Sequence, residues 1–224
     1  MTINKSTLST NTAFNGGGIS SDGTVVIINS TLSGNSALSA SGSAITNNGS
    51  LGIFNGTFSG NSTANGGAIA NNGTATLQNT IVANSLKGGN CSGVITSHGY
   101  NLSSDDTCNF SMTGDLNNID PRLGPLKDYG GPTQTIALRN GSPAIDAGNP
   151  SGCTDEEGYL LKTDQRGAPR PGKEKEADRG CDIGAYEISL KPRPNGLKTG
   201  ENECVHTASR RTHSERCSRL TWSS

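Results

Sequence analysis

One six-residue phrase recurs four times in residues 1–90, and its spacing limits the folds open to the chain. It reads STLSTN at 6–11, STLSGN at 30–35, GTFSGN at 56–61 and NTIVAN at 79–84, so its starts are 24, 26 and 23 residues apart. A second phrase keeps the same period and reads GGGIS at 16–20, GSAIT at 42–46 and GGAIA at 66–70. Self-similarity at a period of 20–50 residues indicates a solenoid.

Short apolar alternations between Gly, Asn and Ser turns predict three short strands in each repeat. A coil of about 24 residues bent in this way has the geometry of a single-stranded parallel β-helix, which rises by about 4.8 Å per coil. The bias of parallel crossovers favours a right-handed coil. We therefore expect an all-β solenoid over residues 1–90. Its interior stacks are expected to be Leu8, Leu32, Phe58 and Ile81 in one ladder and Ile19, Ile45 and Ile69 in another.

The asparagine that closes each phrase is predicted to lie at a corner of its coil. These residues are Asn11, Asn35, Asn61 and Asn84. An amide side chain at such a corner can bond to the same amide one coil away, as in other in-register stacks. We assign these four residues a structural role.

Charged residues are almost absent from the repeats, and this limits the chemistry that they can perform. Between residues 6 and 86 the only charged side chain is Asp22. Polysaccharide hydrolysis needs two carboxylates as acid and base, and a calcium site needs several oxygen ligands. We therefore expect no catalytic residue and no cofactor in these coils. One alternative is a fragment of a pectate-lyase-like enzyme whose site lies in further coils upstream.

The repeats and the C-terminal module each resemble a known group of proteins. GTFSGNSTANGGAIANNG at 56–73 resembles the repeats of polymorphic outer-membrane proteins and, more broadly, right-handed parallel β-helix proteins of bacterial surfaces. Residues 120–150, TDQRGAPRP at 163–171 and CDIGAYE at 181–187 resemble the C-terminal module of "choice-of-anchor" bacterial surface proteins. That resemblance implies display at a cell surface and no defined reaction.

Residues 91–190 are expected to form a turn-rich, irregular β module that caps the solenoid, because Gly-Pro and Asp-Pro turn signals are dense there. The chain has six cysteines, none in a CxxC pair, which favours disulfides over a zinc site. They are Cys91, Cys108, Cys153, Cys181, Cys204 and Cys217. Six cysteines allow fifteen pairings. Pairing neighbours along the chain would join Cys91 to Cys108 and Cys153 to Cys181.

The module also contains acidic residues that a calcium ion could use. These candidates are Asp146, Asp164, Asp182 and Glu187. The other interpretation is that they cap turns and that Arg166 forms a salt bridge to one of them. We favour the second interpretation.

Residues 191–224 carry seven Lys/Arg and three Glu, and such a basic polar tail is predicted to be disordered. The repeat begins directly after Met1, so we expect the chain to be part of a longer protein. We expect a monomeric, non-enzymatic protein that is secreted or displayed at a bacterial surface. Its Asn/Ser/Thr surface would present hydrogen-bonding groups to a glycan or protein partner, with no nucleic acid and no transmembrane segment. A passive spacer is the further alternative.

Overall fold

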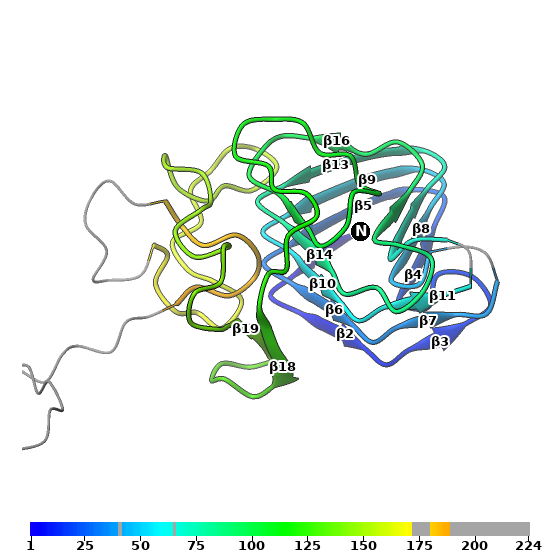
Figure 1. Cartoon of the computed structure of the whole chain (residues 1–224), viewed down its shortest axis with the longest axis horizontal. Helices are drawn as coiled ribbons and strands as arrows, with labels where there is room; N and C mark the ends of the chain where they lie inside the picture. The colour runs from blue at the N-terminus through cyan, green and yellow to red at the C-terminus, as the bar shows by residue number, and fades with distance from the viewer. Residues whose placement is uncertain (40–41, 65, 172–179, 189–224) are drawn as a thin grey trace, which may run out of the picture. The chain divides into compact units, whose positions relative to one another are not determined.

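Stacked parallel strands form an all-β solenoid of about four turns, so the predicted parallel β-helix is confirmed (Figure 1). The computed structural model describes residues 1–39, 42–64, 66–171 and 180–188. Solenoid and C-terminal module belong to one compact unit, Met1–Lys191. The predicted tail at 191–224 lies outside the described residues, and the handedness of the coil stays a prediction.

Four parallel sheets run along the solenoid, each with one strand per coil. Sheet A contains β1 (Thr2–Asn4), β5 (Thr24–Ile28), β9 (Ser50–Phe54), β13 (Thr74–Gln78) and β16 (Thr96–Ser97). Sheet B contains β2 (Thr7–Ser9), β6 (Thr31–Ser33), β10 (Thr57–Ser59), β14 (Ile81–Ala83) and β17 (Leu102–Ser103). Sheet C contains β3 (Thr12–Ala13), β7 (Ser36–Ala37) and β11 (Ser62–Thr63). Sheet D contains β4 (Ile19–Ser21), β8 (Ile45–Asn47), β12 (Ile69–Asn71) and β15 (Cys91–Ser92).

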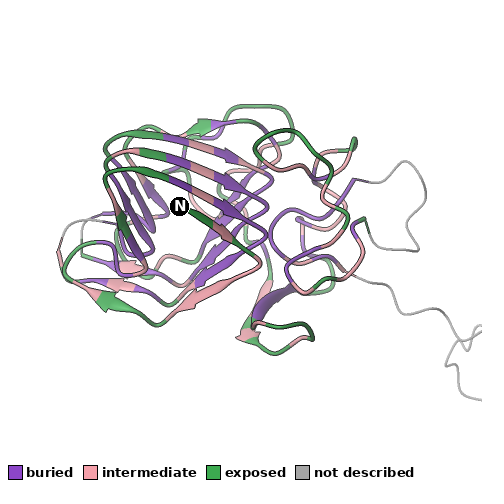
Figure 2. Ribbon diagram, turned by 180° about the vertical axis from the view of Figure 1, so that it is seen from behind, coloured by how far each residue is buried: buried purple, intermediate pink, exposed green. Residues whose placement is uncertain are grey.

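Side chains that alternate inward along these strands form the core of the coils. The predicted ladder of Ile19, Ile45 and Ile69 is confirmed, and Cys91 continues it on β15. Ile45 and Ile69 have no exposed surface. Along β5, β9 and β13 of sheet A, buried residues alternate with exposed or half-buried ones (Figure 2), because successive side chains of a strand point to opposite faces. Every residue of β8, β10, β12 and β14 is buried.

The fourth copy of the phrase is shifted by one residue from the predicted alignment. On β14 it is Val82, not Ile81, that pairs with Phe58 and completes the interior ladder. Asn84 then takes the place of Gly34 and Gly60, where the backbone is left-handed. Asparagine tolerates that conformation better than most residues with a side chain, so it can replace the glycine. The expectation that Ile81 points inward was wrong.

The segment after β17 closes the last coil. Phe110 and Cys108 belong to the same buried cluster as the interior ladders of the coils. The backbone N–H of Tyr100 donates to the carbonyl of Thr113, which fastens the returning chain to the corner before β17. Residues 104–118 therefore cover one end of the solenoid, beyond β15, β16 and β17. Residues 120–171 and 180–188 lie along the flank of sheet B instead.

In its described residues, the flanking part of the module contains one antiparallel hairpin and two isolated antiparallel bridges, and the rest is turns and loops. Its strands are β18 (Leu123–Lys127) and β19 (Thr135–Leu138). Leu138 and Ile183 pack with Ile81 and Leu102 of sheet B in a second buried cluster. The displaced Ile81 is thus fully buried on the outer side of its sheet, between the coil and the module.

Replacing Phe58 by alanine should lower the free energy of unfolding by about 3–5 kcal/mol, because a large side chain with no exposed surface leaves a cavity in the coil interior. Phe14 is 71% exposed and supplies a matched control. Phe14→Ala should change stability by less than about 0.5 kcal/mol. Urea unfolding measures both, and equal effects would contradict the assignment of Phe58 to the core.

Candidate functional site

A column of outward-facing threonines on sheet B holds the C-terminal module. The side chain of Gln165, which has no exposed surface, donates from Nε2 to Thr7 Oγ1 (2.8 Å) and accepts from Thr31 Oγ1 (2.6 Å). One coil further, the backbone N–H of Ala185 donates to Thr57 Oγ1 (2.9 Å). These three threonines, together with Ile81, form what we call the docking column. Thr7 and Thr31 bind Gln165, and Thr57 binds Ala185. Ile81 packs in the second buried cluster.

Gly184 lies so close to this column that it leaves no room for a side chain. A Cβ added at Gly184 would lie 2.7 Å from Thr57 Oγ1 and 2.9 Å from Ile81 Cδ1. Its φ of +99° is also unfavourable for residues with a side chain. The glycine of the CDIGAYE segment is therefore required by contact with the coil.

A second line of contacts follows the corner between sheets A and B. The corner asparagines, Asn29, Asn55 and Asn79, have left-handed φ values of 44°, 56° and 50°. Their Nδ2 atoms donate to the carbonyl oxygens of Thr163 (3.0 Å), Thr154 (2.8 Å) and Asp182 (3.0 Å), respectively. The left-handed corner turns each amide away from the coil interior and towards the module. Sequence reasoning missed these residues, although Asn29 and Asn55 stand immediately before a copy of the phrase and Asn79 is the first residue of the fourth copy.

The predicted asparagine ladder at the other corner extends over three coils. Asn11 Nδ2 donates to Asn35 Oδ1 (2.9 Å), and Asn35 Nδ2 donates to Asn61 Oδ1 (3.1 Å). Asn84 lies outside this ladder because of the one-residue shift, and its Nδ2 lies 3.4 Å from Ser59 Oγ. A further amide contact, unforeseen in the sequence, joins Asn47 Nδ2 to Asn71 Oδ1 (2.7 Å).

Three of the four acidic candidates for a calcium site, Asp164, Asp182 and Glu187, accept hydrogen bonds from protein donors. Asp164 Oδ2 lies 2.7 Å from Arg166 Nη2, and the Arg166 guanidinium stacks 3.6 Å from the ring centroid of Tyr186. Asp182 Oδ1 accepts from the backbone N–H of Asp146 (2.9 Å). Among the described residues, no three His, Cys, Asp or Glu side chains are grouped as a metal site would require. This geometry agrees with turn capping and a salt bridge.

Glu187 and Arg170 form a buried ion pair beneath the module. Glu187 Oε2 lies 3.2 Å from Arg170 Nε, and neither side chain has exposed surface. Burial lowers the pKa of the Arg170 guanidinium, and the nearby carboxylates of Glu187, Asp164 and Asp182 oppose this effect. Arg170 Nη2 also donates to the carbonyl of Gly184 (2.6 Å). The ion pair thus fixes the segment that contacts the docking column. Arg170 lies in TDQRGAPRP and Glu187 in CDIGAYE. Sequence reasoning considered Glu187 as a calcium ligand or a turn cap but assigned no role to Arg170.

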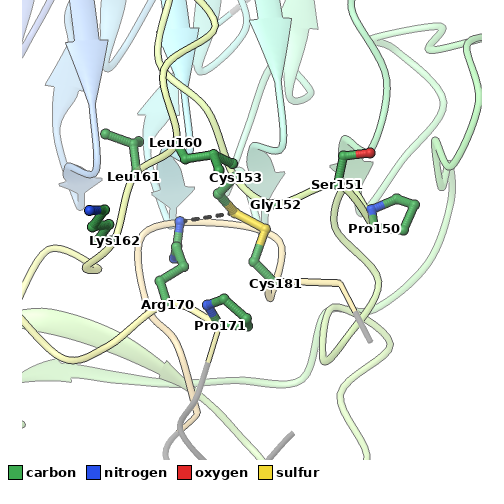
Figure 3. Close-up of a pocket in the computed structure, with 10 residues that line it drawn as sticks. All are labelled: Pro150, Ser151, Gly152, Cys153, Leu160, Leu161, Lys162, Arg170, Pro171 and Cys181. Atoms are coloured by element: carbon green, nitrogen blue, oxygen red, sulfur yellow. Dashed lines mark hydrogen bonds between the residues drawn. A yellow bond between two sulfur atoms is a disulfide. The ribbon is translucent and has the colours of Figure 1, made fainter. Parts of the chain in front are cut away.

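Two disulfides fasten the chain, and they join neighbouring cysteines as expected: Cys91–Cys108 and Cys153–Cys181. Cys153–Cys181 borders a pocket with a volume of about 190 Å³. Figure 3 shows the two sulfur atoms at the centre of its lining, with the Arg170 side chain directed at Cys153. The predicted roles of Cys204 and Cys217 lie outside the described residues.

The outer face of sheet A carries the most regular array of exposed polar groups. Thr24, Ser50 and Thr74 are aligned on successive strands and are exposed. A parallel column two residues along contains Val26, Gly52, Thr76 and Thr96. Neighbouring strands lie about 4.8 Å apart, so hydroxyl groups recur at that interval in the first column. In the second column only Thr76 and Thr96 carry a hydroxyl. We call these two columns the hydroxyl face.

Comparison of the chain with family models, curated proteins and solved structures finds no match. The family resemblances of the repeats and of the C-terminal module therefore stay predictions. What is established is the β-solenoid and its two disulfides. No helix long and apolar enough to cross a bilayer occurs in the described part of the chain.

Replacing Glu187 by glutamine should lower the free energy of unfolding by about 3–5 kcal/mol, because it leaves the charge of Arg170 buried without its partner. Glu156 is exposed and serves as the control, since Glu156→Gln should change stability by less than about 0.5 kcal/mol. Denaturant unfolding measures both values. A small effect for Glu187→Gln would show that the pair adds little to the docking of the module.

Proposed function

We propose that the chain is a non-enzymatic, secreted or cell-surface β-helix protein that presents the hydroxyl face to a glycan or protein partner. The observation that carries the proposal is the division of the coil surface. The docking column and the corner asparagines are covered by the module, whereas Thr24, Ser50 and Thr74 remain exposed. The outer face of sheet A therefore stays open and presents aligned, uncharged hydroxyl groups at Thr24, Ser50 and Thr74.

A glycan suits this surface in its chemistry. Sugars are rich in hydroxyl groups, and serine and threonine hydroxyls act both as donors and as acceptors. The array recurs at the strand spacing, so contacts can repeat along an extended chain. Asp22 is the sole charged residue between positions 6 and 86, which gives no electrostatic reason to prefer an acidic polymer.

Two further observations support the non-enzymatic and extracellular parts of the proposal. One carboxylate in residues 6–86 is fewer than the acid and base that glycoside hydrolysis uses. The two disulfides fit an oxidising compartment, where such bonds form and persist. A glycan on a cell or matrix surface would meet the protein in that compartment.

A glycan array probed with the chain tests the proposal, and Ser50→Arg should weaken any binding at least tenfold because it places a long charged side chain in the array. Ser151→Arg, at an exposed position in the module, is the matched control and should leave binding unchanged. Both variants should unfold like the parent protein.

Three outcomes would contradict this assignment. Binding that survives Ser50→Arg would move the ligand to another surface. Absence of binding to any glycan or surface protein would leave a passive spacer. Release of sugar fragments from acidic polysaccharides would indicate an enzyme.

A further inference from the structure

The two disulfides lie in different chemical surroundings. Cys91 and Cys108 belong to the apolar core of the coils, and none of the described side chains donates to their sulfur atoms. By contrast, Cys153 Sγ lies 2.9 Å from Asn79 Nδ2 and 3.4 Å from Arg170 Nη1. Two N–H donors, one of them from a guanidinium, therefore point at one sulfur of the second disulfide.

We infer that Cys153–Cys181 is a thiol-exchange site that takes a small thiol through the adjoining pocket, with Cys181 attacked and Cys153 leaving. The inference is independent of the ligand of the hydroxyl face. It rests on the donors around Cys153 and on the pocket that borders both cysteines.

The surroundings of Cys153 decide which sulfur leaves. In exchange, the leaving sulfur takes the electron pair of the S–S bond and becomes a thiolate, and a stabilised thiolate leaves faster. A positively charged neighbour stabilises a thiolate. Arg170 and Asn79 already contact Cys153 Sγ, whereas Cys181 Sγ is 3.9 Å from Asn79 Nδ2. Departure of Cys153 is therefore favoured.

The reaction is balanced by two molecules of thiol. The first, as thiolate, bonds to Cys181 Sγ while the bond to Cys153 Sγ breaks, which gives a mixed disulfide and the Cys153 thiolate. A second thiolate attacks the sulfur of the bound thiol, and the Cys181 thiolate leaves. The small thiol is oxidised to its disulfide, and the protein disulfide is reduced to two thiols after proton uptake from water.

The burial of the two sulfur atoms explains why the thiol that reaches them is a small molecule. Cys153 and Cys181 are 2% and 0% exposed, so the side chain of another protein cannot reach their sulfurs from open solvent. The pocket has a volume of about 190 Å³, which admits a compact thiol. In Figure 3 Gly152 and Leu160 lie beside the sulfurs, while Lys162 lies beyond Leu161. Lys162 is exposed and gives the lining a positive charge.

Exchange would loosen the module at a defined place. The disulfide joins the loop after Pro150 to the segment that contains Asp182 and Gly184, and both partners lie against Asn79. Once it is reduced, no covalent bond joins these two stretches, and hydrogen bonds to Asn79 and the packing of Ile183 hold them in place. Cys91–Cys108 stays intact, so the coils keep their closed end.

The test uses the full chain and 2-mercaptoethanol, with acid quenching, alkylation and peptide mass spectrometry at successive times. Cys153–Cys181 should be reduced at least tenfold faster than Cys91–Cys108. The mixed disulfide should be found on Cys181, with Cys153 alkylated. Equal rates for the two disulfides, or an adduct mainly on Cys153, would overturn the inference.

The double variant Arg170→Gln/Glu187→Gln tests whether Arg170 assists the departure of Cys153 or only shields the disulfide, because removing both charges leaves no buried ion without its partner. If Arg170 stabilises the leaving thiolate, exchange at Cys153–Cys181 should slow several-fold and the preference for Cys181 should weaken. Faster exchange in this variant would mean that Arg170 merely shields the disulfide, and the proposal would fail. Arg139→Gln, at an exposed position, is the control and should react like the parent protein.

Discussion

The left-handed corner between sheets A and B is the constraint on which the rest of the structure depends. At Asn29, Asn55 and Asn79 the chain must adopt positive φ to pass from one sheet to the next. Asparagine can do so and still carries an amide, which glycine lacks. One residue type thus turns the coil and binds the module. The docking column, the buried ion pair and the second apolar cluster all lie beside this corner.

Much of the solenoid could be predicted from the repeated phrase, because a coil must place like residues in register. The ladder through Ile45 follows directly from that rule. The fourth copy was aligned incorrectly because NTIVAN has an asparagine at each end. Matching by residue type placed Asn84 with Asn35 and Asn61. The strand register instead matches Asn84 to the left-handed glycines. Backbone conformation, not residue identity, was the property that the repeat preserved.

The C-terminal module was less predictable because its contacts join residues far apart in the chain. Gln165 reaches Thr7 and Thr31, and nothing in a local pattern indicates that an outward threonine will be covered. The acidic residues of the module were recognisable as turn formers. A salt bridge of Arg166 to one of them was predicted as well, and its partner is Asp164. The burial of Glu187 against Arg170 depends on how the turns fold over the flank, which the sequence does not indicate.

The single side chain of Gln165 spans two coils, and the corner asparagines extend the contacts of the module to four coils in all. Solenoids ordinarily hold each repeat by its immediate neighbours, so they can fray coil by coil from an end. The C-terminal module contacts several coils at once and so opposes this fraying, because no single coil that it contacts can detach without breaking its bonds to the module. Under a pulling force the described unit would therefore stay folded until the contacts of the module with the coils break, and it would then unfold in one step.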